Sequence, residues 1–583
     1  MRSIGLLAVI SALSLLACDS DETGTGGSGA TGGGGSGATG GGGAGGAGGA
    51  GGDGGAGAAP VTGPIAGPVT RYDYVFDLAA LTADTSLTID AQAPGGDCVA
   101  LESLLPPSGE VTWNDAPATS AIAEGGALQV CGAPVAPGEL TVRASTVFPK
   151  KKYYGLDVGF SVKKDLAGGD FSYLVSWVGG CDFFGPCDDD PGTVAEMHFE
   201  IKHAPGDVVL CPGVRTASET STRCDIEGTL APTYSGVGWA ADPLWERSSF
   251  MTSQGVEWVF FEVPGGQLAA SLDPAMMADF FEWATGLFGP FPYGNELRFA
   301  GGPTAWLGFE HPANIVLHEE LGTLTTSYAD TMAHVTMHEV VHQWAGDRVT
   351  IASAADFVWK EAMAEYLPYV FEDEQLPPEV AASSREYWDS ISLQSQHFPR
   401  PTEDPTPPVN TFYGDVYGPG PMVLFIQLEP LIGRPAVLAG IQAFLKEPGA
   451  RSVDELKKAL EAASGADLTP YFDAWVFGAG APEWPTMKVE ATQVGDEVTV
   501  AVTQQNASGK LYGCVVEVDV VGATQTVTAT IDFGLAPETA TATAKVTLAE
   551  PVVTTTLDPR NRLVARESIA ALTSPKPRPI WIF

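Results

Sequence analysis

Two histidines four residues apart, followed by a glutamate, constrain the fold of this sequence more than any other feature. The segment from His338 to His342 reads HEVVH, and Glu361 lies nineteen residues beyond the second histidine. Residues four apart on an α-helix lie on the same face, so both imidazoles can reach one metal ion. The sequence therefore predicts a helix that carries both histidines and a second, returning helix that carries Glu361.

These residue types in this order favour zinc. Hydrolytic zinc sites use three nitrogen or carboxylate ligands and leave a fourth position open, which predicts His338, His342 and Glu361 as the metal ligands. Glu339 lies about 100° around the helix from its neighbours. It can therefore reach a water at the metal without binding the metal, as a general base does.

The residues around this motif resemble the aminopeptidase N family of gluzincin peptidases. The runs HEVVHQWAGDRVT and DFVWKEAMAEY place several further residues where the family pattern has them: Trp344, Gly346, Val349, Thr350, Asp356 and Trp359. Two positions depart from the pattern, with Lys360 in place of Asn and Ala362 in place of Gly. Neither departure removes a ligand.

The resemblance implies residues that bind the substrate. The run AWLGFEHPANIVL resembles the family's Gly-Ala-Met-Glu-Asn segment, which makes Gly308 and Glu310 substrate-binding residues, although His311 replaces the usual Asn. In the family this glutamate grips the free amino terminus, and a carboxylate suits a protonated amine. Tyr417 matches the family tyrosine that donates to the oxyanion, an effect worth roughly 3 kcal/mol in other hydrolases; Tyr413 is its rival.

The family's second residue for seating the substrate amine is missing from this sequence. The run GPCDDDPGTVAEM resembles the family's Pro-Cys-x-Asp-x-Pro segment, and the family has a glutamine or glutamate about ten residues earlier. Val175, Ser176 and Trp177 stand there instead. No acidic partner for Glu310 is visible in this stretch of sequence.

Three residues near the motif have alternative interpretations. Asp356 either orients a ligand histidine, as carboxylates behind zinc-bound imidazole do, or caps a helix. His334 lies one turn before His338 on the ligand face, and we expect it to pack in the core. Glu365 shares a face with Glu361 and is either a partner of a ligand or solvated.

The pattern of apolar residues and punctuation predicts a multidomain α+β fold. Short alternating segments over 65–265 predict an N-terminal β-sheet domain. Apolar residues at spacings of three and four over 266–484, with caps at Asp273 and Ser452, predict a mainly helical, thermolysin-like catalytic domain. Strand patterns return over 485–583 and predict a C-terminal β-sandwich.

The first 64 residues predict export and attachment. Residues 1–18 combine Arg2, an apolar run of about thirteen residues, too short to span a membrane, and Cys18 after a small residue. This indicates a lipoprotein signal with lipidation at Cys18, with an ordinary secretory signal as the alternative. Residues 19–64 are a Gly-rich flexible tether. We expect a lipid-anchored protein of the bacterial cell envelope. In some bacteria an Asp directly after the lipidated cysteine holds lipoproteins at the inner membrane, so Asp19 leaves the choice between inner and outer membrane open.

The net charge restricts the possible partners, and the positions of the cysteines predict disulfides. The formal net charge is −41, so nucleic acid and anionic headgroups would repel this surface. The basic run 150–152 favours a charged strand edge over a binding patch. For the cysteines after Cys18, local pairing is the simplest prediction, with Cys514 left as a buried thiol: Cys98 with Cys131, Cys181 with Cys187, and Cys211 with Cys224.

Together these features predict a membrane-anchored zinc metallopeptidase that removes residues from the amino terminus of peptides. One alternative keeps the zinc but is an endopeptidase, or an ester or epoxide hydrolase. A further alternative is an inactive cell-surface binding protein with the same fold. The intact set His338, Glu339, His342, Glu361 and Tyr417 argues against that last alternative.

Overall fold

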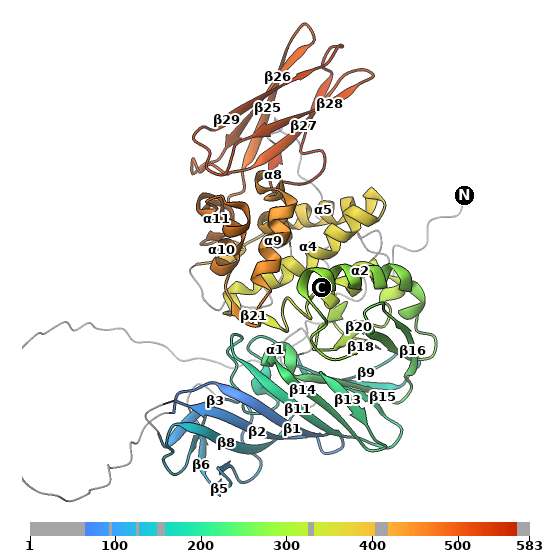
Figure 1. Cartoon of the computed structure of the whole chain (residues 1–583), viewed down its shortest axis with the longest axis vertical. Helices are drawn as coiled ribbons and strands as arrows, with labels where there is room; N and C mark the ends of the chain where they lie inside the picture. The colour runs from blue at the N-terminus through green and yellow to red at the C-terminus, as the bar shows by residue number, and fades with distance from the viewer. Residues whose placement is uncertain are drawn as a thin grey trace, which may run out of the picture. The chain divides into compact units, whose positions relative to one another are not determined.

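The computed structural model describes residues 65–92, 96–123, 127–148, 158–324, 331–402 and 418–567. All of them belong to one compact unit, Pro60–Phe583. Along this unit the chain runs through β-sheets, a helical region and a second set of β-sheets (Figure 1). This order, with a β-rich start, a helical middle and a β-sheet end, confirms the predicted multidomain α+β class.

An eight-stranded sheet forms the base of the N-terminal region. Its strands, in spatial order, are β13 (Val214–Ala217), β14 (Ser221–Pro232), β11 (Val194–Lys202), β1 (Val69–Asp77), β2 (Thr82–Ala91), β8 (Gly138–Val147), β4 (Thr112–Trp113) and β5 (Ala116–Pro117). Buried and more exposed residues alternate along β1, as expected for a sheet with one covered face. Its buried side chains Tyr72, Tyr74 and Phe76 stack along the strand.

Two smaller sheets complete this region. One has the order β12 (Val208–Leu210), β15 (Gly238–Asp242), β10 (Asp170–Val175) and β9 (Gly159–Lys164). The other has the order β3 (Cys98–Glu102), β7 (Ala127–Cys131) and β6 (Thr119–Ile122). A single helical turn, α1 (Thr233–Gly236), joins β14 to β15 and is fully buried.

A five-stranded sheet leads into the helical region. Its order is β16 (Glu246–Met251), β17 (Glu257–Glu262), β18 (Glu296–Gly302), β20 (Asn314–His318) and β19 (Gly308–Phe309), and α2 (Pro274–Phe288) lies between β17 and β18 in the chain. Its strands come from both sides of residue 265, the predicted end of the N-terminal β-sheet domain. The domain boundaries stay predictions. Because β19 is the edge strand and packs against the helix that carries the histidines, it can border a site.

Helices dominate from residue 331 to 475. They are α3 (Thr331–Val341), α4 (Phe357–Gln375), α5 (Pro378–Ser392), α7 (Pro419–Pro421), the π-helix η6 (Met422–Ile426), α8 (Glu429–Ile432), α9 (Arg434–Phe444), α10 (Val453–Ser464) and α11 (Thr469–Trp475). The two predicted caps are present: Asp273 accepts from Ala275 at the start of α2, and Ser452 forms a capping box with Glu455 at the start of α10. Helices α3 and α4 pack against each other.

The C-terminal region consists of two sheets, as predicted. One has the order β29 (Thr541–Thr547), β26 (Glu497–Gln505), β25 (Thr486–Val494) and β31 (Arg566–Glu567). The other has the order β28 (Thr526–Asp532), β27 (Val515–Val521) and β30 (Thr554–Leu557). Along β26 and β27 every second side chain is buried, which is the pattern of a sandwich with one inner face per sheet.

The three predicted disulfides are confirmed: Cys98–Cys131, Cys181–Cys187 and Cys211–Cys224, with Cys514 a buried thiol. Among the residues that the structure describes, no helix is both long and apolar enough to span a membrane. Cys18, the tether and the basic run 150–152 lie outside the described residues.

Candidate metal and active site

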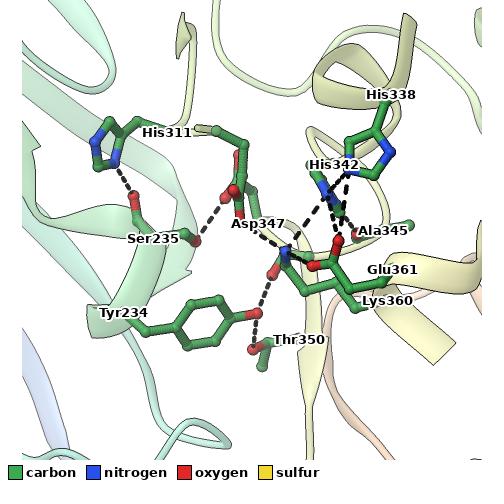
Figure 2. A network of polar contacts seen from close by, with 12 residues as sticks. Tyr234, Ser235, His311, His338, His342, Ala345, Asp347, Thr350, Lys360 and Glu361 are labelled. Atoms are coloured by element: carbon green, nitrogen blue, oxygen red, sulfur yellow. Dashed lines mark hydrogen bonds and ion pairs between the residues drawn. The ribbon is translucent and has the colours of Figure 1, made fainter. Parts of the chain in front are cut away.

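Helices α3 and α4 bring the three predicted metal ligands together (Figure 2). The Nε2 atoms of His338 and His342 lie 3.0 Å apart. Glu361 Oε2 lies 3.5 Å from the first of these atoms and 3.8 Å from the second. All three side chains are buried. His338 on α3, His342 directly after the last residue of α3 and Glu361 on α4 therefore converge on a single point.

The convergence fits a zinc ion. Tetrahedral zinc with ligand bonds of 2.0–2.1 Å holds its donor atoms about 3.3 Å apart, and the three observed separations of 3.0, 3.5 and 3.8 Å bracket that value. Two ring nitrogens and a carboxylate oxygen are also the donor types that zinc prefers. The residues present therefore fit this metal in both chemistry and spacing.

The other ring nitrogen of each histidine has an acceptor that fixes its orientation. His342 Nδ1 lies 3.0 Å from the carbonyl oxygen of Ala345, and His338 Nδ1 lies 2.9 Å from Glu365 Oε1. An acceptor at Nδ1 places the proton there and leaves Nε2 with its lone pair toward the metal. These contacts orient both imidazole rings so that each Nε2 atom is directed toward the point where the ligands converge.

The surroundings shift the pKa values of the two ligand histidines in opposite directions. Burial by itself lowers the pKa of His338, but hydrogen bonds to Glu361 and Glu365 raise it to about 10. Burial, and then the charge of Lys360, lower the pKa of His342 well below its usual value. A metal ion at this point would therefore displace a proton that the carboxylates hold on His338.

Behind His338 lies a buried chain of charged side chains. Glu365 contacts His338 with one oxygen and His334 Nε2 with the other, at 3.1 Å, and His334 Nδ1 lies 2.8 Å from Glu372 Oε1. Burial alone would lower the pKa of His334, but the charges of Glu372 and Glu365 raise it to about 10. His334 is buried in the core, as predicted, and it also lies between two carboxylates that favour its protonated form.

Glu365 takes the place that the sequence had suggested for Asp356. Asp356 accepts hydrogen bonds from Ser353, Arg400 and the backbone of Val453, at 2.6–3.1 Å. It stands at the N-cap of α4 but makes no side-chain cap bond there. Both predicted roles of Asp356 are thus corrected: it ties α4 to α10, and Glu365 orients the ligand histidine.

Glu339 is placed as a general base would be. Its side chain is buried, and Oε2 has no hydrogen-bond partner within the described part of the chain. Burial raises the pKa of Glu339 to about 8, against a lowering by His338. A Cβ atom on Gly308 would lie only 2.2 Å from Glu339 Oε1, so a larger residue in the edge strand β19 would displace this carboxylate.

Glu310 follows β19 and is paired with a lysine of this chain. Lys360 Nζ lies 2.8 Å from Glu310 Oε1 and 2.7 Å from Glu361 Oε1. Burial alone would lower the pKa of Lys360, but the charges of Glu310 and Glu361 raise it above its usual value. The sequence marked Lys360 only as a departure from the family pattern and missed these contacts.

Helical spacing in the sequence pointed to part of this network. Glu365 lies four residues after Glu361, and His334 lies four residues before His338, so each repeats a ligand position one turn away. The partner of Lys360 has no such signal, because Glu310 is 50 residues distant in the chain. Tyr417 and its rival Tyr413 lie outside the described residues.

Comparison with known proteins assigns this region to a family. The model of the peptidase family M1 domain matches residues 310–475. Tricorn protease-interacting factor F2 of Thermoplasma volcanium is 30% identical over 166 residues, which cover 26% of this chain and 20% of that protein. Puromycin-sensitive aminopeptidase of Caenorhabditis elegans is 24% identical over 341 residues, 55% of this chain and 35% of that protein. Aminopeptidase N of Lactococcus lactis is 25% identical over 197 residues, 31% of this chain and 22% of that protein.

A solved structure supports the same fold. The crystal structure of Legionella pneumophila aminopeptidase A in complex with aspartic acid superposes with a TM-score of 0.69 at 14% identity, over 87% of this chain and 60% of that chain. The matches to the three relatives span 20% to 35% of their lengths. The match identifies residues 310–475 as a peptidase family M1 domain, and together with the aminopeptidases among the relatives it supports an aminopeptidase N-like gluzincin metallopeptidase.

Proposed function

We propose that this protein is a zinc-dependent aminopeptidase that hydrolyses peptide bonds at the amino terminus of peptides. The observation that carries the proposal is the convergence of His338, His342 and Glu361, with the buried Glu339 carboxylate beside them. The M1 domain match and the aminopeptidases among the relatives support the same activity.

The described residues divide the chemistry between them. His338, His342 and Glu361 would hold zinc, which supplies electrophilic polarisation of the scissile carbonyl and favours deprotonation of a water. Glu339 takes the proton of the attacking water and later delivers it to the leaving amine. A pKa raised to about 8 keeps this carboxyl close to the working range of a general acid and base near neutral pH. Tyr417 is proposed to donate to the oxyanion.

Metal content and activity together test this proposal. The purified protein should contain one zinc per chain and release amino-terminal residues from aminoacyl amide dyes, and a chelator should abolish that activity. His342→Ala should bind little zinc, because two donors cannot close the site. Full zinc occupancy in that variant, or chelator-resistant turnover, would refute the assignment of the ligands.

A second candidate function is supported by the Lys360–Glu310 ion pair of 2.8 Å. If Glu310 is already neutralised, the same zinc centre could act as an endopeptidase, or as an ester or epoxide hydrolase, because none of these reactions needs a substrate ammonium. Turnover of internally cleaved peptides without release of amino-terminal residues would favour this candidate over the first.

We also propose that the protein is exported and anchored in the cell envelope by lipid on Cys18, with residues 19–64 as a tether. The support is the sequence of residues 1–18, with its apolar run of about thirteen residues, shorter than a membrane span. Cys18→Ser should convert a membrane-bound protein into a released and active one. Retention of Cys18→Ser in the membrane fraction would contradict lipidation at this residue.

A further inference from the structure

The Lys360 ammonium occupies a position between two acidic side chains of the active site. Its Nζ lies 2.8 Å from Glu310 Oε1 and 2.7 Å from Glu361 Oε1. The side chains of Lys360, Glu310 and Glu361 expose 2%, 6% and 2% of their surfaces. At these distances and this burial, both ion pairs are charge-assisted hydrogen bonds shielded from water, the strong class of such contacts.

Packing around the lysine side chain holds the ammonium in place. Gly346 has a φ of +148°, and a Cβ atom there would lie 2.9 Å from Lys360 Cε. The ring of Phe357 lies on another side, with its centroid 5.2 Å from Nζ. A side chain enclosed by a close backbone and a ring loses much of its freedom to move aside, so the pairing with Glu310 is built into the site.

The pairing changes what Glu310 can do for a substrate. A free amino terminus is an ammonium, and it gains most from a carboxylate whose charge is not already neutralised. The Glu310 carboxylate is already paired with the Lys360 ammonium. A substrate ammonium would therefore have to share this carboxylate with Lys360. Lys360 Nζ also lies 3.5 Å from His342 Nε2, so the resident cation stands next to the catalytic centre.

Aromatic rings surround Phe357, the ring next to Lys360. Trp177 lies in the stretch of sequence where the family has a glutamine or glutamate. Its ring centroid lies 5.5 Å from that of Phe309 and 5.8 Å from that of Phe357. The ring of Trp306 stacks on the ring of Trp177, with the centroids 6.5 Å apart. These rings provide apolar surface that can contact an acylated or internal residue as well as a free amino terminus.

We infer that Lys360 is a specificity-determining residue, whose ammonium on Glu310 lets this site accept peptides that lack a free amino terminus. This inference rests on the proposed peptide hydrolysis and defines its substrate class: amino-terminally acylated peptides and internal bonds are cleaved alongside free termini. The specificity for free over blocked termini is correspondingly small.

The test compares kcat/KM for matched peptides with free and acetylated amino termini, in the full-length protein with its zinc content measured. The wild type should favour the free peptide by less than about tenfold. Lys360→Met should raise this ratio at least tenfold, because it returns a charged Glu310 to the substrate, whereas Lys360→Arg should keep the ratio low. Lys488→Met, which removes an exposed lysine paired with Glu490, is the matched control and should leave the ratio unchanged.

A binding measurement separates this inference from the proposed function. Calorimetric titration with leucinamide and with N-acetyl-leucinamide is carried out in the Glu339→Gln background, which removes turnover. The protein with Lys360 should bind both within tenfold, and the protein with Lys360→Met should favour leucinamide. Should Lys360→Met fail to fold, Lys360→Asn keeps a donor without the charge and should shift the ratio in the same direction. A wild-type preference above 100-fold for the free amine, unchanged by either neutral substitution, would overturn the inference. Failure to hydrolyse any peptide, with the binding pattern as expected, would instead overturn the proposed function.

Discussion

Replacing His334 removes the cation that lies between Glu365 and Glu372. His334 Nε2 and Nδ1 lie 3.1 and 2.8 Å from these carboxylates, and all three side chains are at most 2% exposed. Removing one partner of a buried ion pair leaves an uncompensated charge and costs about 3–5 kcal/mol. We therefore expect His334→Asn to lower the free energy of unfolding by an amount in this range.

The pKa of His334 supports the same magnitude and sets its pH dependence. The value in the folded protein, about 10, exceeds the ordinary value of 6.5. At pH 7 this difference amounts to roughly 4 kcal/mol at about 1.4 kcal/mol per pKa unit. Because the folded-state pKa is raised, the stabilisation is complete below about pH 6.5 and is lost as the pH rises through about 10. The cost of His334→Asn should therefore shrink from pH 7 toward pH 10.

Urea unfolding of the metal-free protein, followed by tryptophan fluorescence, measures this cost. His311→Asn is the matched control, since His311 is equally buried but burial lowers its pKa to about 4, so that it is neutral and its loss removes one hydrogen bond to Ser235. That change should cost about 0.5–1.5 kcal/mol. Adding Glu372→Gln to His334→Asn should recover at least about 1 kcal/mol, because it removes one unpaired carboxylate. A loss for His334→Asn no larger than that of the control would refute the imidazolium assignment.

Three other predictions follow from the described contacts. Glu339→Gln should keep its zinc but lose about 10²–10⁴-fold in kcat, since the amide cannot accept a proton; near-normal turnover would place the base elsewhere. Gly308→Ala should lower kcat with little change in Tm, because a Cβ 2.2 Å from Glu339 Oε1 displaces a flexible side chain; a large fall in Tm with unchanged kcat would contradict this. Burial, and then Asp165, raise the pKa of the buried Asp242 to about 6. The free energy of unfolding should therefore fall as the pH rises from about 4 to 6, and it should stay lowered above pH 6 because the ionised carboxylate is then buried. Asp242→Asn should therefore stabilise the protein by about 1–2 kcal/mol at pH 8 and by little at pH 4, as thermal unfolding at the two pH values would show.

The sequence determined the features that depend on local geometry. Two histidines four residues apart share a helix face whatever surrounds the helix, and the structure shows their Nε2 atoms 3.0 Å apart. The cap of α10 at Ser452 is local in the same sense, and the three disulfides join cysteines 6 to 33 residues apart. Alternation and helical periodicity likewise predicted the order of β and helical regions, because each element buries its own apolar face.

Only the tertiary structure decided how charged side chains from different elements pair. Asp356 and Glu365 were both candidates to orient a ligand histidine, and the packing of α3 against α4 selected Glu365. Lys360 faces Glu310 because the edge strand β19 packs against α3, which no local pattern reveals. Burial then makes these pairings strong, since a charge removed from water must find a partner. The sequence thus determined the candidate metal ligands, and long-range packing determined the charges that surround them.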